Sequence, residues 1–195
     1  MKQGKILIVS GPSGVGKGTV LKELMKRHSN MRFSVSATTR PIRPGEVDGV
    51  HYHFLTKADF ETLIAEDALL EYASYADNYY GTPIAPVMEG VNRGEIVVLE
   101  IEVQGALNVM SRLKDAVSVF IAPPSYEELR NRLTNRGDTA PEIAEKRLKI
   151  AIEECGQAHA YKYTVVNRTV EEAVREMEAI LLAESCRSEF NPINL

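Results

Sequence analysis

Residues 6–19 read ILIVSGPSGVGKGT, an apolar run followed at once by a glycine-rich loop with the spacing G-x-x-x-x-G-K. Glycines let such a loop curl until successive backbone N–H groups point at one anion, and the helix that follows adds its positive N-terminal dipole. Lys17 can then reach the phosphates as a positive charge. Because residues 20–25 (VLKELM) continue with one apolar helical face, the pattern predicts a strand, a phosphate-binding loop and a helix.

The residues that this pattern assigns to nucleotide phosphates are Gly11, Pro12, Ser13, Gly14, Val15, Gly16, Lys17, Gly18 and Thr19. Gly18 stands where such loops usually carry the hydroxyl that touches Mg²⁺. Thr19 comes one residue later, so we expect nucleotide oxygens and water to hold the ion, because Mg²⁺ keeps several waters readily. Glu100, at the end of the run IVVLE, is the carboxylate expected to orient this water. The alternative is a strand-end carboxylate without a role.

Composition limits the class of protein. The 195 residues are 44% hydrophobic and 26% charged, with a formal net charge of −4, which predicts one soluble domain and does not favour nucleic-acid binding. No cleavage site follows residues 1–10, and no apolar stretch approaches the ~20 residues that span a bilayer. Cys155 and Cys186 lack the spacing of metal ligands. We expect a cytoplasmic protein that binds neither nucleic acid nor membrane; the oligomeric state stays open.

Strands and helices alternate along most of the chain. Apolar, often β-branched runs predict buried strands at residues 6–10, 96–101 and 117–121 and, more weakly, at 163–166. The patterns Ser125-x-x-Glu128 and Thr169-x-x-Glu172 are capping boxes that open two of the intervening helices. This alternation predicts an α/β fold in three layers, with a parallel sheet covered by helices on both faces.

Two stretches interrupt this alternation. Residues 34–93 are polar and rich in tyrosine, and Thr56-x-x-Asp59 predicts a short helix within them. Residues 126–147 are charged and helical, with a Gly-Asp hinge near the middle. We interpret both stretches as insertions that can move over a site. The core that carries them would consist of residues 1–33, 94–125 and 148–195.

The first insertion contains a second candidate anion site. Arg40 and Arg43 flank Pro41 ahead of Tyr52, and the prolines stiffen this segment. Arginine forks suit bidentate phosphate binding, and a tyrosine hydroxyl adds a directional donor. The alternative is a solvated basic loop.

The run EYASYADNYYGT (residues 71–82) supplies Glu71, Tyr80 and Thr82. A carboxylate that accepts two N–H bonds matches the N1–H and N2 amino edge of guanine. Adenine lacks this pair of donors and would leave the carboxylate unpaired, so the pattern favours guanine over adenine.

A third group of arginines lies in and after the second insertion. Arg132 and Arg136 are four residues apart on one helical face, and Arg147 follows on the next helix. Phosphoryl transfer needs positioning and charge neutralisation more than covalent help, and arginines on a mobile segment can supply both. The alternative is a set of surface ion pairs with the neighbouring acids.

The separated motifs together resemble those of guanylate kinases. GPSGVGKGT, SVSATTRPIRPGEVDGVHY, NYYGT, LEIEVQGA, FIAPPSYEELRNRL, RG and VVN occur in the right order, and the resemblance runs from about residue 4 to residue 185. It implies a P-loop NTPase fold with a three-layer α/β/α core, a GMP-binding region at residues 34–93 and a lid at residues 126–147. It also implies transfer of the γ-phosphoryl group of ATP to GMP or dGMP with Mg²⁺, giving ADP and GDP.

The resemblance also implies roles by position. Around guanine it places Ser36, Glu71, Thr82 and Glu102, and at the GMP phosphate Arg40, Arg43, Tyr52 and Tyr80. The expected catalytic residues are Lys17, Arg40, Arg136 and Arg147, and Arg132 and Asn167 are expected near the ATP base and sugar. The family commonly has aspartate where this chain has Glu102, and the extra methylene shifts its hydrogen bonds.

Three other functions compete with this interpretation. A kinase of the same fold could use another acceptor, such as a different nucleoside monophosphate or ribose bisphosphate, but Glu71 with Ser36 and Thr82 favours guanine. Kinase-like modules of scaffold proteins bind phosphopeptides, but their phosphate loop is typically degraded, whereas here it is intact apart from Gly18. A signalling GTPase would carry an N-K-x-D-type motif late in the chain, and this sequence has none.

Overall fold

The computed structural model describes residues 4–134 and 141–189 and is built on a parallel five-stranded sheet. The strands lie in the order β2 (Met31–Phe33), β7 (Ile96–Glu100), β1 (Lys5–Ser10), β8 (Val117–Ala122) and β9 (Tyr163–Val166). All four neighbouring pairs are parallel. Four of these strands were predicted, and the three-residue edge strand β2 was not, because three residues carry no readable period.

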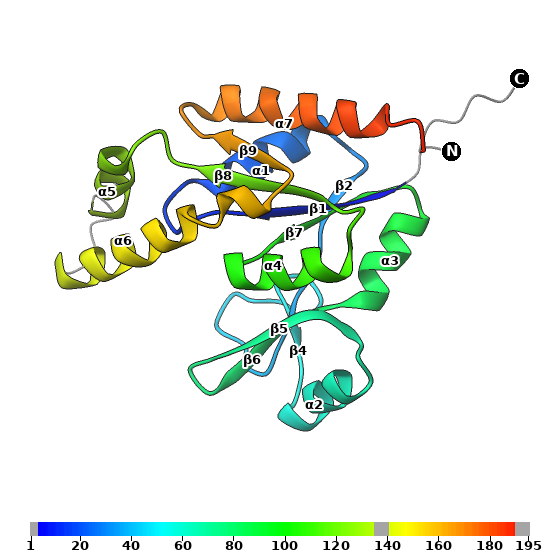
Figure 1. Cartoon of the computed structure of the whole chain (residues 1–195). Coiled ribbons are helices and arrows are strands. Elements are labelled where there is room, and N and C mark those ends of the chain that lie inside the picture. Colours follow the sequence, from blue (N-terminus) through cyan, green and yellow to red (C-terminus); the bar gives the residue numbers. More distant parts are fainter. Residues whose placement is uncertain (1–3, 135–140, 190–195) are drawn as a thin grey trace, which may run out of the picture.

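Helices cover both faces of this sheet (Figure 1). Leu7 and Val9 of β1 pack toward α1 (Lys17–Arg27) and α7 (Val170–Ser185), whereas Ile8 packs toward α3 (Ile84–Asn92) and α4 (Val103–Arg112). All three β1 side chains are fully buried. A strand buried on both faces explains the continuous apolar run in the sequence, and the three-layer prediction is confirmed.

Side-chain caps open the helices that the sequence predicted. The hydroxyls of Thr56, Ser125 and Thr169 accept hydrogen bonds from backbone N–H groups three residues later, at 3.1, 3.1 and 3.2 Å. They open α2 (Lys57–Ala65), α5 (Tyr126–Thr134) and α7. Such caps satisfy N–H groups that the first turn of a helix leaves unpaired.

A second sheet comes from the tyrosine-rich stretch and lies below α4 in Figure 1. Its order is β4 (His53–Phe54), β3 (Ala37–Thr38), β6 (Asn78–Pro83) and β5 (Leu69–Tyr75). On this sheet α2 buries Phe60, which stacks on Tyr79 with ring centroids 5.2 Å apart. The helix α3 that ends the stretch packs instead on the central sheet through Val87.

The charged second stretch forms α5 and the first half of α6 (Pro141–Cys155). Leu129 and Leu133 of α5 pack against Leu148 and Ala151 of α6 in a small cluster of their own. A short 3₁₀ turn, Ala158–Ala160, leads from α6 to β9. In the part of the chain that the structure describes, no helix is both long enough and apolar enough to cross a membrane.

Candidate functional site

The glycine-rich loop connects β1 to α1, as the sequence predicted. Gly11, Gly14 and Gly16 have φ angles of 145°, 81° and 93°, which residues with side chains rarely adopt. A Cβ atom on Gly11 would also run into the carbonyl of Ile121. The first turn of α1 contains no acidic residue, so nothing in that turn opposes an anion at its positive end.

Lys17, the first residue of α1, folds back over the loop. Its Nζ donates to the carbonyls of Gly11, at 2.6 Å, and Pro12, at 3.1 Å. Burial lowers the pKa of Lys17, while Glu100, Glu102 and Glu154 act in the opposite direction. The amine is therefore held at the loop by carbonyls, and the negative charges of three glutamates favour its protonated form.

Glu100 lies beside Gly18. A Cβ atom on Gly18 would be 3.7 Å from Oε1 of Glu100, so this carboxylate faces the position where such loops usually carry a hydroxyl. Within residues 4–134 and 141–189, no three His, Cys, Asp or Glu side chains form a group that could hold a metal ion. Oxygen donors from a nucleotide and water would have to supply most of the shell of a Mg²⁺ ion here.

Arg132 and Asn167 meet at the phosphate loop from distant parts of the chain. Both donate to the carbonyl of Val15, Nδ2 of Asn167 at 2.7 Å and Nη1 of Arg132 at 3.3 Å. Nη2 of Arg132 also donates to the backbone carbonyl of Asn167 at 3.3 Å. Asn167 is buried, and its Oδ1 has no hydrogen-bond partner in the described part of the chain. These hydrogen bonds connect α5 and the end of β9 to the phosphate loop.

The structure does not place the other two predicted arginines at the loop. Arg136 falls in residues 135–140, outside the described residues. Arg147 lies on α6 and is exposed. Arg132 also pairs with Glu128 at 2.8 Å, the kind of ion pair that the alternative interpretation expected.

Glu71 and Thr82 are joined on the second sheet. Oγ1 of Thr82 donates to Oε1 of Glu71 at 2.7 Å, and Thr82 is buried. Burial raises the pKa of Glu71, and the bond from Thr82 acts against this shift. Gly105 of α4 covers the carboxylate, because a Cβ atom at this glycine would lie 3.0 Å from Oε2 of Glu71.

For Ser36 and Glu102, the contacts in the described part of the chain give less support to a place at the predicted guanine site. The carbonyl of Ser36 accepts from the backbone of His53 at 2.9 Å, which holds two short strands together. Glu102 is exposed at the N-cap of α4, near Lys17. Among the hydrogen bonds of the described residues, none joins Glu102 to Glu71 or Thr82. The guanine contacts of Ser36 and Glu102 stay predictions.

The second candidate anion site is centred on Arg40. Its guanidinium carbon lies 5.5 Å from the ring centre of Tyr52 and 5.6 Å from that of Phe54. The rings of Tyr52 and Tyr80 meet edge to face, with centroids 6.1 Å apart. Arg43 is exposed a few residues away. The structure therefore brings Arg40, Tyr52 and Tyr80 together, as the motif predicted.

Sequence reasoning missed two carboxylates at these sites. Glu46 pairs with Arg40, and it belongs to the TTRPIRPGE motif, so the motif was the available signal. Glu154 of α6 approaches the loop and accepts a hydrogen bond from the backbone of Ser13; burial and then Glu102 raise its pKa. Nothing in the sequence distinguishes Glu154 from its neighbours on α6.

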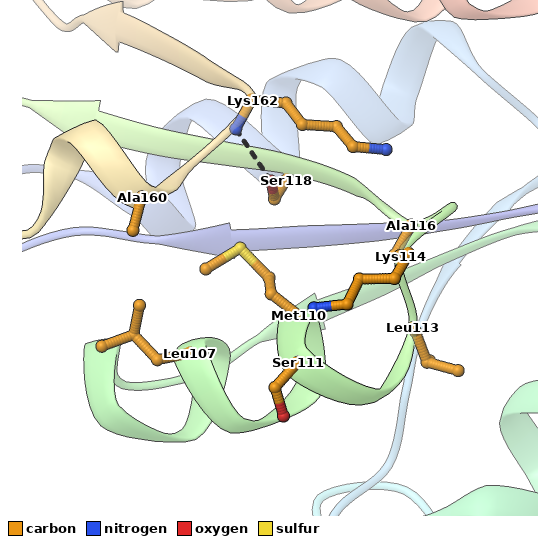
Figure 2. A pocket seen from close by; sticks show the side chains of 9 residues that line it. All are labelled: Leu107, Met110, Ser111, Leu113, Lys114, Ala116, Ser118, Ala160 and Lys162. Atoms are coloured by element: carbon orange, nitrogen blue, oxygen red, sulfur yellow. Dashed lines mark hydrogen bonds between the residues drawn. The ribbon is translucent and has the colours of Figure 1, made fainter.

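A cavity of about 350 Å³ lies away from these clusters (Figure 2). It is lined by Leu107, Met110, Ser111, Leu113, Lys114, Ala116, Ser118, Ala160 and Lys162. The backbone N–H of Lys162 donates to Ser118 Oγ at 3.0 Å. The cavity is near the amino ends of β8 and β9, whereas the phosphate loop follows the carboxyl end of β1. None of the predicted site residues lines it.

A parallel α/β/α sheet whose first strand runs into this glycine-rich loop is the architecture of a P-loop NTPase. The sequence model of the guanylate kinase family matches residues 3–184. A guanylate kinase of Clostridium perfringens (strain SM101 / Type A) is 51% identical over 185 residues, which are 95% of this chain and 86% of the relative.

Other matches agree. A guanylate kinase of Thermus thermophilus is 50% identical over 186 residues, 95% of this chain and 84% of the relative. The crystal structure of guanylate kinase from Anaplasma phagocytophilum superimposes with a TM-score of 0.73 at 36% identity, covering 96% of this chain and 89% of that one. The chain belongs to the guanylate kinase family.

Proposed function

We propose that ATP binds at the phosphate loop and GMP at the second sheet, so that the γ-phosphoryl group passes between them. As a guanylate kinase, the chain is an ATP:GMP phosphotransferase that forms ADP and GDP. One observation carries the proposed arrangement: the first turn of α4 lies between Lys17 of the phosphate loop and Glu71 of the second sheet. Its N-cap residue Glu102 is close to Lys17, and Gly105 packs against Glu71.

In this proposal the second sheet supplies recognition. Arg40, Arg43, Tyr52 and Tyr80 bind the GMP phosphate, and the Glu71 carboxylate, held by Thr82, accepts the N1–H and N2 amino bonds of guanine. Ser36 and Glu102 complete the base site. The raised pKa of Glu71 and its burial support this role, because a half-buried carboxylate with one side-chain donor still has acceptor capacity for a ligand.

The phosphate loop supplies the catalytic charge. Lys17 lies on the phosphate side, with Arg40 at the acceptor and Arg136 and Arg147 proposed to reach the transferring group from the second insertion. Arg132 and Asn167 hold the ATP base and sugar at the edge of the loop. Mg²⁺, when bound with ATP, would neutralise phosphate charge, and Glu100 is the described carboxylate that could orient its water. Aligning donor and acceptor while neutralising charge is what phosphoryl transfer requires.

An acceptor panel tests this function. ADP release with ATP and Mg²⁺ would be followed with GMP, dGMP, AMP, CMP, dTMP and ribose 1,5-bisphosphate in turn. We expect strong preference for GMP and dGMP. Activity on another acceptor would leave the proposed role of the phosphate loop intact but contradict the base site.

We also propose that ATP and GMP are the partners of this protein, that it binds neither nucleic acid nor membrane, and that its location is cytoplasmic.

A glycine-to-alanine change tests whether the carboxylate of Glu71 must keep its place. Gly105→Ala puts a methyl group 3.0 Å from Oε2 of Glu71, closer than ordinary contact, so the carboxylate has to shift. We expect the KM for GMP to rise about tenfold, while alanine's better helix propensity leaves the thermal midpoint unchanged or higher. Steady-state kinetics with varied GMP and varied ATP measures both constants. An unchanged KM for GMP would separate Gly105 and Glu71 from base binding.

The division of the chain predicts closure. We propose that the regions of residues 34–93 and 126–147 move over the core (residues 1–33, 94–125 and 148–195) when both nucleotides bind, which excludes water as a competing acceptor. We expect the radius of gyration from solution scattering to fall when a two-substrate analogue is added. Identical scattering profiles with and without the analogue would contradict this movement.

A further inference from the structure

Glu46 is the one direct carboxylate partner that the described part of the chain offers to Arg40. Nη1 and Nη2 of Arg40 donate to Oε2 and Oε1 of Glu46 at 3.0 and 2.8 Å, a two-point pairing. The side chains are only 11% and 19% exposed, so this is not a solvated surface pair. Paired end to end in this way, the guanidinium plane is fixed in direction as well as in place.

The other donors of Arg40 lie along one edge. A guanidinium has five N–H donors in a fixed fork. The second Nη1 hydrogen goes to the carbonyl of Pro41 at 2.7 Å, and with the two bonds to Glu46 this uses three donors. The Nε hydrogen and one Nη2 hydrogen point the same way from the fork, and a phosphate can accept from such an edge with two oxygens. Tyr80, proposed for the same phosphate, also interacts with the Arg40 side chain.

The same carboxylate also shapes the loop that carries the second arginine. Oε2 of Glu46 accepts from the backbone N–H of Arg43 at 2.8 Å, and the Glu46 N–H donates to the Arg43 carbonyl at 3.0 Å. The hydrogen bond from Arg40 lowers the pKa of Glu46 to about 2, so its charge persists at any pH at which the enzyme works. One group therefore connects both arginines of the motif.

We propose that Glu46 is a positioning residue for the phosphate of the acceptor nucleotide: by holding the end of the Arg40 fork, it directs the other edge of that fork at the phosphate. The inference rests on the proposed role of Arg40 in binding GMP. The alternative interpretation is that Glu46 competes with GMP and occupies Arg40 until GMP displaces it. The two interpretations predict opposite changes in GMP affinity, because loss of a positioning group weakens GMP binding and loss of a competitor strengthens it.

The test compares Glu46→Gln with Asp48→Asn. Asp48 is a matched control, since it lies in the same loop and its Oδ1 accepts from the backbone of Phe54 at 2.8 Å instead of from an arginine side chain. We expect Glu46→Gln to raise the KM for GMP about 10- to 100-fold, with the KM for ATP within about twofold. Asp48→Asn should leave both unchanged.

Guanosine provides a readout that a merely structural role would not give. Its inhibition constant should not change in Glu46→Gln, because guanosine lacks the phosphate at which Glu46 acts. Loss of guanosine binding along with GMP would mean that the whole region is disturbed and would overturn a positioning role. A lower KM for GMP would also overturn it in favour of competition. Glu46→Asp, which keeps the charge but shortens the reach, should fall between wild type and Glu46→Gln.

Arg40→Met and the double variant Arg40→Met/Glu46→Gln separate this inference from the proposed function. If Glu46 acts through Arg40, the double variant has the same KM for GMP as Arg40→Met. If Arg40→Met raises that KM and Glu46→Gln does not, the inference fails and the phosphate site stands. If Arg40→Met changes nothing, the proposed phosphate site itself fails.

Discussion

Replacing Glu71 by glutamine raises the KM for GMP about 100-fold and leaves the KM for ATP within about threefold. The carboxylate has only acceptor oxygens, one of which already takes the hydroxyl of Thr82. A glutamine amide brings N–H donors to a place where guanine also brings donors, so at least one pair is left unmatched and partly buried. Steady-state kinetics with each substrate varied in turn measures the effect.

Glu61→Gln is the matched control, because Glu61 is exposed on α2, the helix that packs on the same sheet as Glu71. It should match wild type in both constants. Equal rises of the two KM values in Glu71→Gln would remove Glu71 from base recognition. The folded state should not suffer: burial raises the pKa of Glu71, so its ionised form opposes folding at neutral pH. We therefore expect the thermal midpoint of Glu71→Gln at pH 7 to equal or exceed that of wild type.

The same raised pKa predicts how base binding responds to acid. Glu71 takes up a proton at a higher pH than an ordinary glutamate, and a protonated carboxyl can no longer accept two N–H bonds freely. Guanosine is the right probe, because the phosphate of GMP itself titrates near pH 6. Inhibition by guanosine should weaken as the pH falls toward the pKa of Glu71. In Glu71→Gln it should be weak and flat over the same range.

The parts of the fold that were predicted correctly depend on neighbours in sequence. The loop between β1 and α1, the buried strands and the caps at Ser125 and Thr169 each depend on a pattern a few residues long. Loop geometry, a cap within the first turn of a helix and the apolar run of a buried strand can each be recognised from neighbouring residues. The same holds for Arg40 and Tyr52, which one short motif brings together.

What the sequence did not reveal depends on contacts between distant segments. The two-residue strands β3 and β4 exist because they pair with each other and β3 pairs with β6, and neither has a period to read. Glu154 on α6 approaches Ser13 at the other end of the chain, and Gly105 on α4 covers Glu71 on β5. A sequence shows that glutamates are present, and only the packing shows which of them meets the phosphate loop.

Lys17→Met lowers kcat about 1,000-fold or more, the largest effect expected on the chemical step. Lys17 is held against the start of the loop by the carbonyls of Gly11, at 2.6 Å, and Pro12, at 3.1 Å. Methionine keeps much of the length and fills similar space but carries no charge, so we expect the transferring group to lose one of the positive charges that stabilise it. ATP affinity should fall much less, because the loop backbone N–H groups still bind the phosphates.

Lys22→Met provides the comparison, since Lys22 is exposed on the same helix. This substitution removes the same charge at a position away from the loop. It should retain full activity. Single-turnover kinetics with saturating ATP and GMP measures the chemical step, and calorimetric titration with ATP measures binding separately. Because burial lowers the pKa of Lys17, kcat/KM in wild type should also decline with rising pH earlier than an ordinary lysine would allow. If Lys17→Met kept kcat within tenfold of wild type, the charge at the transferring group would have to come mainly from the arginines of the second insertion.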